Sequence, residues 1–556
     1  MPFAVPQATN IARPWYLRRV TLRVEILLLI TSIAISASSN TVFWRALLTE
    51  RDMALPANWL VAAAMFVLIT CLHFIILALV SNRWTLKPVL AVLLIANAFA
   101  VYFINQYTVY LDPTMLRNVL RTDVAETADL LSFGMLQHLF FYAVLPLLFL
   151  SRVDIVKLPI LRALLIRIGV LGFAFLLGAA ALLSEFQDLS ATMRNQRAMR
   201  YLITPANFLY SGFRVLTAEA EVASRPLAAV GEDAVQIFAP GVVRRPRVLV
   251  LVVGETARAA NWGLSGYTRQ TTAELAKLDV INFTNTTSCG TNTEVSVPCM
   301  FSQIGRRDYD ESQIRSSESL LHVLKHAEVR SVWIDNQSGC KGVCANLEFI
   351  RATLPPESSD VARLCPGGQC FDEVLADSIR PLLSSNPRDL VIVLHQMGNH
   401  GPAYFKRYPA GFEQFAPVCK NVELGKCTQQ EIVNAYDNAL SYTDYVLAQT
   451  IALLKLQTSH DAGMIYVSDH GESLGENNLY LHGVPFSIAP RVQTHVPMVM
   501  WFSPGFVEAN RIKLDCLRER AKLASSHDNL FHTTLGLLDI RSAVYEPALD
   551  LVAECR

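Results

Sequence analysis

The chain of 556 residues carries at positions 248–253 the run VLVLVV, which is followed directly by Gly254 and Glu255. An unbroken run of Val and Leu is typical of a strand buried on both faces of a parallel sheet. Similar runs, with helical patterns between them, recur at 390–394, 464–467 and 496–501. This alternation of strands and helices predicts an α/β domain with a mostly parallel sheet.

Ionisable side chains follow three of these runs, where each strand is expected to end. They are Glu255 after the first run, His395 and His400 after the second, and Asp469, His470 and Glu472 after the third. Functional sites in parallel sheets gather at the carboxyl ends of the strands. Each side chain alone also has a structural explanation, such as a helix cap or a buried core histidine. Together they predict a metal-dependent site, because Zn²⁺ accepts carboxylate oxygens and imidazole nitrogens as ligands.

A hydroxyl-rich stretch supplies candidate nucleophiles for such a site. Residues 286–299 read TTSCGTNTEVSVPC and follow a short strand-like segment at 280–283. Coordination to Zn²⁺ activates a hydroxyl group, and the amides of a helix N-terminus bind phosphate. Ser and Thr also occur at helix starts merely as caps. Position alone therefore leaves four candidates, which are Thr287, Ser288, Thr291 and Thr293.

The part before residue 185 is apolar and contributes strongly to a hydrophobic fraction of 52%. Stretches long enough to cross a bilayer lie at 24–44, 59–80, 88–103, 131–150 and 164–183. A cleaved signal peptide is the alternative for the first stretch, because small residues follow it, but the later spans disfavour that interpretation. We expect a transmembrane domain of five helices over 1–185, interfacial helices and a linker over 186–245, and a soluble catalytic domain over 246–556.

Charge and cysteine distribution predict how the chain is placed in the cell. Basic residues cluster before the first span and after the second and fourth, which predicts a cytoplasmic N-terminus and places everything after residue 183 outside the cytoplasm. Only Cys71 precedes residue 185, and the ten later cysteines suggest disulfides in an oxidising compartment. The balance of 48 basic and 48 acidic residues argues against nucleic acid as a partner.

One loop between spans has an unusual polar spacing. Asn118, Thr122 and Glu126 fall at i, i+4 and i+8, which places them on one face if the stretch is helical. A solvated helix face explains this spacing, and so does a surface that contacts a lipid headgroup at the membrane boundary.

Six motifs between residues 252 and 536 resemble those of the membrane-bound phosphoethanolamine transferases of Gram-negative bacteria, a family that includes lipid A modifying enzymes and transferable colistin-resistance proteins. The resemblance covers nearly the whole chain and implies a place in the bacterial inner membrane. The motifs are VVGETAR at 252–258, SCGTNT with VPCMFS within 288–302, DNQSGCKGVC at 335–344, HQMGNHGP at 395–402, SDHGESLGE at 468–476, and SHDNLFHTTLG at 526–536. The resemblance implies five N-terminal transmembrane helices and a periplasmic α/β domain of the alkaline phosphatase and sulfatase fold.

The resemblance also implies the roles of individual residues. It implies one tightly bound zinc ion held by Glu255, Asp469 and His470, with Thr293 as the metal-bound nucleophile. The remaining implied residues contact substrate or assist proton transfer, with a second zinc as an alternative partner for the two histidines: His400, His482, Glu472, Lys341, Asn118, Thr122 and Glu126. One departure from the family is Glu294, beside the nucleophile, where a small residue is more usual.

The cysteine pairing is likewise a hypothesis that family likeness supports, because ten cysteines allow many connectivities. The expected pairs are Cys289 with Cys299, Cys340 with Cys344, Cys365 with Cys370, Cys419 with Cys427, and Cys516 with Cys555. A structural zinc site built from the close cysteine pairs is the weaker alternative, since thiols are readily oxidised outside the cytoplasm.

The implied reaction moves phosphoethanolamine from phosphatidylethanolamine to a phosphate of lipid A through a covalent threonine intermediate, with diacylglycerol as the product. Sensitivity to polymyxin and other cationic peptides would then fall. The alternatives are another lipopolysaccharide or envelope glycan as acceptor, and a phosphoglycerol transferase of the same superfamily. A sulfatase is disfavoured because the pattern CxPxR is missing near Cys289. An inactive scaffold is disfavoured by the intact ligand set. We expect a monomer among membrane lipids.

Overall fold

The chain forms two compact units, which are described separately. The computed structural model describes residues 19–49, 51–122, 127, 130–223, 226–237, 244–355 and 357–556. One unit comprises Met1–Asn105 and Phe133–Leu209, and the other comprises Gln106–Ser132 and Tyr210–Arg556. The second unit therefore includes a segment that lies, in sequence, between two predicted spans.

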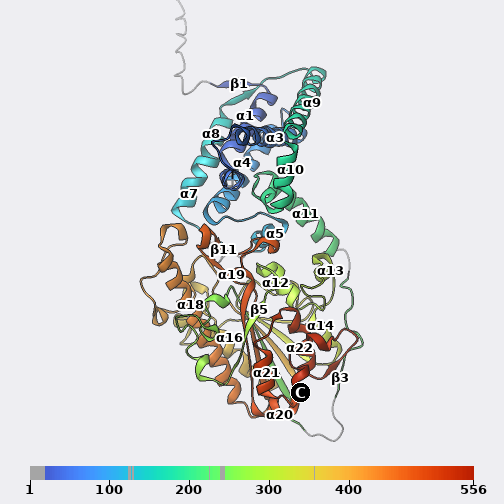
Figure 1. Cartoon of the computed structure of the whole chain (residues 1–556), viewed down its shortest axis with the longest axis vertical. Helices are drawn as coiled ribbons and strands as arrows, with labels where there is room; N and C mark the ends of the chain where they lie inside the picture. The colour runs from blue at the N-terminus through green and yellow to red at the C-terminus, as the bar shows by residue number, and fades with distance from the viewer. Residues whose placement is uncertain are drawn as a thin grey trace, which may run out of the picture. The chain divides into compact units, whose positions relative to one another are not determined.

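The first unit is helical and apolar. Within the described ranges, four spans are long and apolar enough to cross a membrane: α3 (Pro56–Val80), α4 (Leu86–Tyr107), the continuous run Phe133–Ser151 of α7, η2 and α8, and α9 (Ile160–Ser184). They correspond to the last four predicted spans, and Figure 1 shows them in blue to green. A short parallel pair of strands, β1 (Val20–Leu22) and β2 (Val153–Ile155), completes this unit.

The first predicted span is not one straight helix. It is divided into α1 (Val24–Ser38) and α2 (Thr41–Leu48), which meet at an angle of 56°. The side-chain amide of Asn40 donates a 3.0 Å hydrogen bond to the Ile35 carbonyl, so a side chain satisfies the end of α1 where the backbone leaves the helix. The apolar stretch predicted over 24–44 thus forms two helices with a bend between them, and the count of five spans holds if the bent pair is one span.

The second unit is built on a sheet that confirms the four predicted strands. In its described part the strand order is β13 (Ser525–Ser526), β5 (Ile281–Thr287), β12 (His495–Phe502), β9 (Asp461–Ser468), β4 (Arg247–Gly254), β8 (Leu390–His395), β6 (Arg330–Asp335) and β7 (Glu348–Arg351). The run from β9 to β7 is parallel, whereas β12 is antiparallel to both of its neighbours. Every residue of β4 is buried, as expected for a central strand.

Helices cover both faces of this sheet (Figure 1). Alternate residues of β4 enter two separate apolar cores: Leu249 lies in one and Val250 in the other. The first core includes α12 (Thr293–Met300), α14 (Leu320–His326) and α22 (Asp528–Leu537). The second includes α16 (Glu373–Asp377), α17 (Ile379–Ser385) and α18 (Gln429–Lys455). The sheet is therefore buried on both sides, and its edges and strand ends remain for chemistry.

Shorter elements surround the two main parts of the fold. They are α5 (Pro113–Arg121), α10 (Phe186–Asn195), α11 (Ala206–Ala223), β3 (Val235–Gln236), α13 (Glu311–Ser316), α15 (Val361–Leu364), β10 (Ser473–Leu474), β11 (Tyr480–Leu481), α19 (Arg491–Thr494), α20 (Pro504–Asn510), α21 (Leu514–Arg520) and β14 (Ile540–Arg541). Helices do occur within 186–245, and β3 pairs with β14 after them. Their predicted place at the membrane interface stays a prediction.

The ten cysteines after residue 185 form the five disulfides that were expected. The pairs are Cys289–Cys299, Cys340–Cys344, Cys365–Cys370, Cys419–Cys427 and Cys516–Cys555. Cys71 is a free, buried cysteine. The alternative of a structural zinc site made of cysteines is therefore wrong, because those thiols are paired with one another.

A buried charge network ties together the strand ends opposite the site. Arg247, the first residue of β4, is fully buried, and its backbone and side chain donate to Asp389 at 2.8 and 3.1 Å. Its guanidinium also donates to Asp539 at 2.7 Å. Burial works to raise the pKa of Asp389, but Arg244 and Arg247 outweigh that effect and lower it. The carboxylate is thus kept charged in the folded state.

We expect Asp389→Asn to destabilise the protein by roughly 3 kcal/mol near neutral pH, because it leaves a buried guanidinium without one of its partners. A group whose pKa is lowered on folding stabilises the fold above its unfolded pKa, and this contribution disappears as the pH falls through the folded value. Unfolding midpoints of the detergent-solubilised protein should therefore converge for the two forms in acid. Glu348→Gln, which breaks an exposed pair with Arg330, is the matched control with little expected effect. An equally stable Asp389→Asn variant at neutral pH would contradict the assignment.

Candidate active site

The pairing of β4 with β9 brings the predicted metal ligands together. Gly254 at the end of β4 is in register with Ser468 at the end of β9, so the residues that follow these strands are neighbours. One ligand atom each of Glu255, Asp469 and His470 lies within 4.8 Å of the other two, and all three residues are buried. The structure therefore assembles the three side chains that the sequence analysis singled out.

Of the four candidate hydroxyls, Thr293 is the one that reaches this cluster. Its Oγ1 lies 3.2 and 3.3 Å from the two carboxylate oxygens of Glu255 and 3.4 Å from His470 Nε2. Ser288 and Thr291 instead donate to the backbone carbonyls of Gly290 and Val484, and Thr287 is exposed. Geometry thus separates candidates that sequence position alone left open.

Helix α12 positions Thr293 at its first residue. Asn292 caps the helix, because its side-chain oxygen accepts from the Val295 amide at 3.1 Å. The loop before the cap is held by His527, whose Nδ1 accepts from the Cys289 amide at 3.0 Å and whose Nε2 donates to the Ser468 carbonyl at 2.9 Å. Burial lowers the pKa of His527 to about 4, which keeps the ring neutral for both roles.

Electrostatics of the cluster favour a bound cation. Burial, followed by the negative charge of Glu255, raises the pKa of Asp469 to about 6. Burial works to lower the pKa of His470, but the two carboxylates raise it to about 10. For Glu255 the hydrogen bond and charge of His470 outweigh burial and lower the pKa. Two carboxylates pressed together in a buried site need a compensating positive charge.

An unsatisfied oxygen shows that the residues present suit a metal ion. Among the described residues, Asp469 Oδ2 is buried and has no hydrogen-bond partner. His470 Nε2 lies 3.3 Å from this oxygen but makes no hydrogen bond with it. A buried carboxylate oxygen without a hydrogen bond is costly, and a metal ion would satisfy it. Two carboxylates, one imidazole and the Thr293 hydroxyl form a donor set that matches catalytic zinc sites. Glu255, Asp469, His470 and Thr293 therefore fit the implied cofactor.

Two further histidines, His482 and His400, lie near the metal cluster. The ring centre of His482 is 4.3 Å from that of His470 and 6.0 Å from that of His400. His482 Nδ1 donates to Glu472 at 2.8 Å, and the other oxygen of Glu472 accepts from the Tyr404 hydroxyl at 2.5 Å. Both oxygens of Glu472 thus orient other side chains, while its expected contact with substrate stays a prediction. Nε2 of His482 is the ring nitrogen left for other partners.

His395 does not belong to the metal cluster. Its Nδ1 donates to Asp335 at 2.8 Å, and its ring packs edge-on against Trp333. This is the buried core histidine that the sequence analysis kept as the structural explanation for such a residue.

The loop after β6 reaches the cluster through a residue that the sequence analysis missed. Gln337 Nε2 donates to Glu255 at 3.2 Å, and Ser338 links Gln337 to Lys341, whose amine donates to the Ser338 hydroxyl at 2.6 Å. The disulfide Cys340–Cys344 closes this loop. Gln337 stands in the motif DNQSGCKGVC, which was the available signal, although no charge or metal-ligand pattern distinguished it.

The proposed lipid-facing residues are only partly on a helix. Asn118 lies on α5, but the helix ends at Arg121 and the backbone of Thr122 is extended. The Thr122 hydroxyl donates to the Asn118 carbonyl at 2.9 Å and so satisfies the helix end. The expectation of one helical face through position 122 was wrong for this reason. Glu126 lies outside the described residues.

Comparisons with known proteins identify the family of this chain. Residues 247–540 match the sulfatase family, and residues 69–220 match the family described as phosphoethanolamine transferase EptA/EptB. The chain is 36% identical over 546 residues to phosphoethanolamine transferase EptA of Escherichia coli K12, which covers 97% of this chain and 98% of that protein. It is 38% identical over 500 residues to phosphatidylethanolamine transferase Mcr-1 of Escherichia coli, covering 88% and 91%.

A solved structure extends the likeness to the whole fold. The integral membrane lipooligosaccharide phosphoethanolamine transferase A (EptA) of Neisseria meningitidis superposes with a TM-score of 0.91 at 35% identity, over 97% of this chain and 99% of that protein. Its soluble domain, solved separately, is 42% identical with a TM-score of 0.57 and covers 60% of this chain. The chain therefore belongs to the membrane-bound phosphoethanolamine transferases, and its residues 247–540 form a domain of the sulfatase family.

Proposed function

We propose that this enzyme transfers phosphoethanolamine from phosphatidylethanolamine to a phosphate of lipid A, with Thr293 as the nucleophile. The observation that carries the proposal is the Thr293 hydroxyl, which stands within 3.4 Å of both Glu255 and His470. Lipid A appears in the name of a relative, Kdo(2)-lipid A phosphoethanolamine 7''-transferase of Escherichia coli K12, which is 31% identical over 53% of this chain. The five disulfides support a periplasmic catalytic domain and, with it, a cytoplasmic N-terminus.

In the first step, the Thr293 oxygen attacks the phosphorus of the donor and forms a phosphoester bond. Zn²⁺ held by Glu255, Asp469 and His470 would supply positive charge that favours the deprotonated hydroxyl and the charged phosphoryl group. Because Glu255 would hold the metal and its pKa is lowered, it is a weak base, and the threonine proton passes instead to the pair His400 and His482. The bond from phosphorus to the glycerol oxygen breaks, and diacylglycerol leaves after gaining a proton.

The pair His400 and His482 is suited to supply that proton. Glu472 accepts from His482 Nδ1, which fixes the ring so that Nε2 can donate or accept. Tyr404 holds Glu472 in turn. Tyr404 and Glu472 thus lie buried side by side because the tyrosine hydroxyl orients the carboxylate that in turn orients His482.

In the second step, a phosphate oxygen of lipid A attacks the phosphorus of the threonine adduct. The bond to the Thr293 oxygen breaks, the threonine regains a proton, and a diphosphate linkage to ethanolamine remains on the acceptor. Lys341, Asn118 on α5, Thr122 directly after that helix, and Glu126 are proposed to contact the lipid substrates. Tethering the site to the membrane raises its effective concentration towards both lipids, and a monomer suffices.

The nucleophile assignment predicts that Thr293→Ala abolishes the covalent adduct. Intact mass spectrometry of the purified enzyme after incubation with phosphatidylethanolamine should show an added phosphoethanolamine group on the wild type only. Turnover should fall by about a thousandfold or more, because an essential nucleophile is lost. Thr287→Ala is the control, since that exposed hydroxyl lies six residues away in sequence and should leave the adduct unchanged. An adduct that persists on Thr293→Ala would disprove the role.

The ligand assignment predicts a metal content that depends on Asp469 and His470. We expect about one zinc ion per chain in the wild type by elemental analysis, and a loss of most of it in Asp469→Asn or His470→Ala because each removes one of few protein ligands. Asp515→Asn changes a fully exposed carboxylate and is the control. Full zinc occupancy in both ligand variants would place the metal elsewhere.

The acceptor is tested by the mass of lipid A from cells that express the protein. Addition of phosphoethanolamine to lipid A, together with lower sensitivity to polymyxin, is expected, because the added amine offsets negative charge. If another envelope glycan gains the group instead, the acceptor is wrong while the transfer chemistry stands. An added phosphoglycerol would support the alternative activity of the superfamily.

A further inference from the structure

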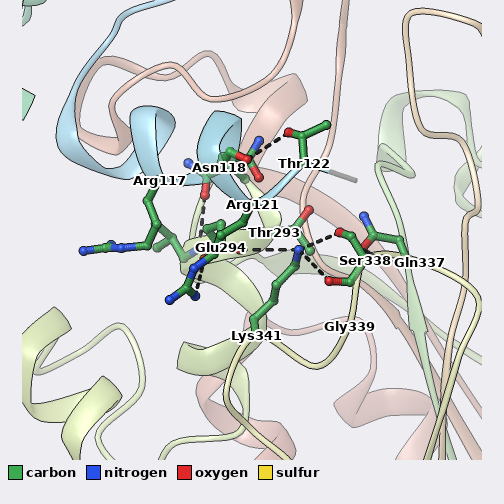
Figure 2. Close-up of polar contacts among 12 residues, drawn as sticks. Arg117, Asn118, Arg121, Thr122, Thr293, Glu294, Gln337, Ser338, Gly339 and Lys341 are labelled. Carbon is green, nitrogen blue, oxygen red and sulfur yellow. Dashed lines mark hydrogen bonds and ion pairs between the residues drawn. The ribbon is translucent and has the colours of Figure 1, made fainter. Parts of the chain in front are cut away.

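The residue after the nucleophile is the centre of a buried ion-pair cluster (Figure 2). Glu294 is fully buried, and one of its oxygens, Oε2, lies 3.1 Å from the guanidinium of Arg121 and 3.3 Å from that of Arg315. Its other oxygen, Oε1, lies 3.3 Å from the amine of Lys341. Among the described residues, three cations thus converge on one carboxylate.

The two oxygens of Glu294 have different partners, and this division has an energetic consequence. Arg315 also donates to the Glu294 carbonyl at 2.6 Å, so its guanidinium is anchored independently of the carboxylate. If the amine of Lys341 moved away, Arg121 and Arg315 would still compensate the buried negative charge. A buried carboxylate left without any cation would be strongly unfavourable, and the two arginines prevent that state.

Lys341 is placed between Glu294 and the metal cluster. Its amine donates to the hydroxyl of Ser338, which leads through Gln337 to Glu255. The lysine side chain is 4% exposed. A cavity of about 530 Å³ borders this lysine together with Arg121 and Arg315. Lys341 therefore borders space that a ligand can enter, and its amine is linked to the metal cluster through Ser338 and Gln337.

We propose that Glu294 is a positioning residue for Lys341. Its carboxylate binds the Lys341 amine while no substrate phosphate is present, and the amine leaves Glu294 when a phosphate ester binds. This inference rests on the proposed function, in which Lys341 contacts phosphate. Glu219 pairs with Arg117 and Arg121, and Glu311 pairs with Arg117 and Arg315. With Lys341 and Glu294 the network holds four cations and three carboxylates, so one positive charge remains uncompensated and can attract a phosphate monoester or diester. Glu294 at the same time repels that anion, which limits its affinity and allows the site to release one phosphate compound before the next one binds.

The test compares binding of O-phosphoethanolamine to the zinc-loaded, full-length protein by titration calorimetry. Glu294→Gln removes the charge and keeps the shape of the side chain. It should lower the dissociation constant by roughly tenfold, the order expected for removing one unit charge several ångströms away in a protein interior. Glu219→Gln is the matched control, because Glu219 pairs with Arg117 and Arg121 of the same network and makes no contact with Lys341. It should change the constant by less than about twofold.

A second variant keeps the inference testable if Glu294→Gln folds poorly. Arg121→Gln removes one cation that retains Glu294, so the carboxylate should hold Lys341 more tightly and phosphate should bind more weakly. The factor by which Arg121→Gln raises the dissociation constant should be at least about threefold smaller when Glu294 is already Gln, because the carboxylate that competes for Lys341 is then absent. Equal losses in both backgrounds would reflect only long-range charge and would overturn the inference.

The outcomes separate this inference from the proposed function. A wild type that binds O-phosphoethanolamine and forms the Thr293 adduct, with an unchanged constant in Glu294→Gln, overturns the role of Glu294 alone. A wild type that neither binds the compound nor forms the adduct overturns both. Tighter binding in Glu294→Gln supports the inference even if lipid A proves to be the wrong acceptor.

Discussion

The parallel pairing of β4 with β9 is the constraint on which the rest of the site depends. Two adjacent strands end in register at Gly254 and Ser468, and the chain then turns outward at Glu255 and Asp469. This places two carboxylates within a few ångströms of each other in a region that excludes water. Such an arrangement is unfavourable unless positive charge joins it, and His470 and a metal ion are suited to provide that charge. The apolar strands fix the backbone firmly enough to maintain this repulsion.

The parts of the fold that local pattern and topology determine could be predicted from the sequence. Apolar runs identified β4, β8, β9 and β12, because strands buried on both faces need continuous apolar residues. The rule that sites form at strand ends then selected six side chains, and family resemblance identified Glu255, Asp469 and His470 among them as the metal ligands. Thr293 was identified only through family resemblance, because Thr287, Ser288 and Thr291 carry hydroxyl groups too and position could not distinguish among the four. The structure distinguishes them through contacts that span 38 and 177 residues of sequence.

The features that were missed depend on single side-chain hydrogen bonds, some of them local and some between distant segments. Asn40 ends a helix inside an apolar stretch, and Thr122 ends one inside a polar stretch, in both cases because a side chain satisfies a helix carbonyl. Gln337 and His527 act on Glu255 and on the loop before Thr293 without being charged or metal-binding residues. Helical periodicity and ligand chemistry carry no signal for such contacts. Glu294 was noticed only as an unusual residue, and its three cationic partners come from separate parts of the chain.

The assignment of α5 to the second unit bears on how such a protein can evolve. Residues 106–132 are encoded between two membrane helices, yet they are part of the catalytic unit, and Arg121 within them pairs with Glu294 beside the nucleophile. The protein is therefore not a soluble enzyme to which an anchor was simply appended. Recombination that exchanged the N-terminal half as a block would replace α5 as well, and would separate a buried carboxylate from its cation. The two halves are thus expected to be inherited together, with substitutions in α5 and around Glu294 occurring in concert.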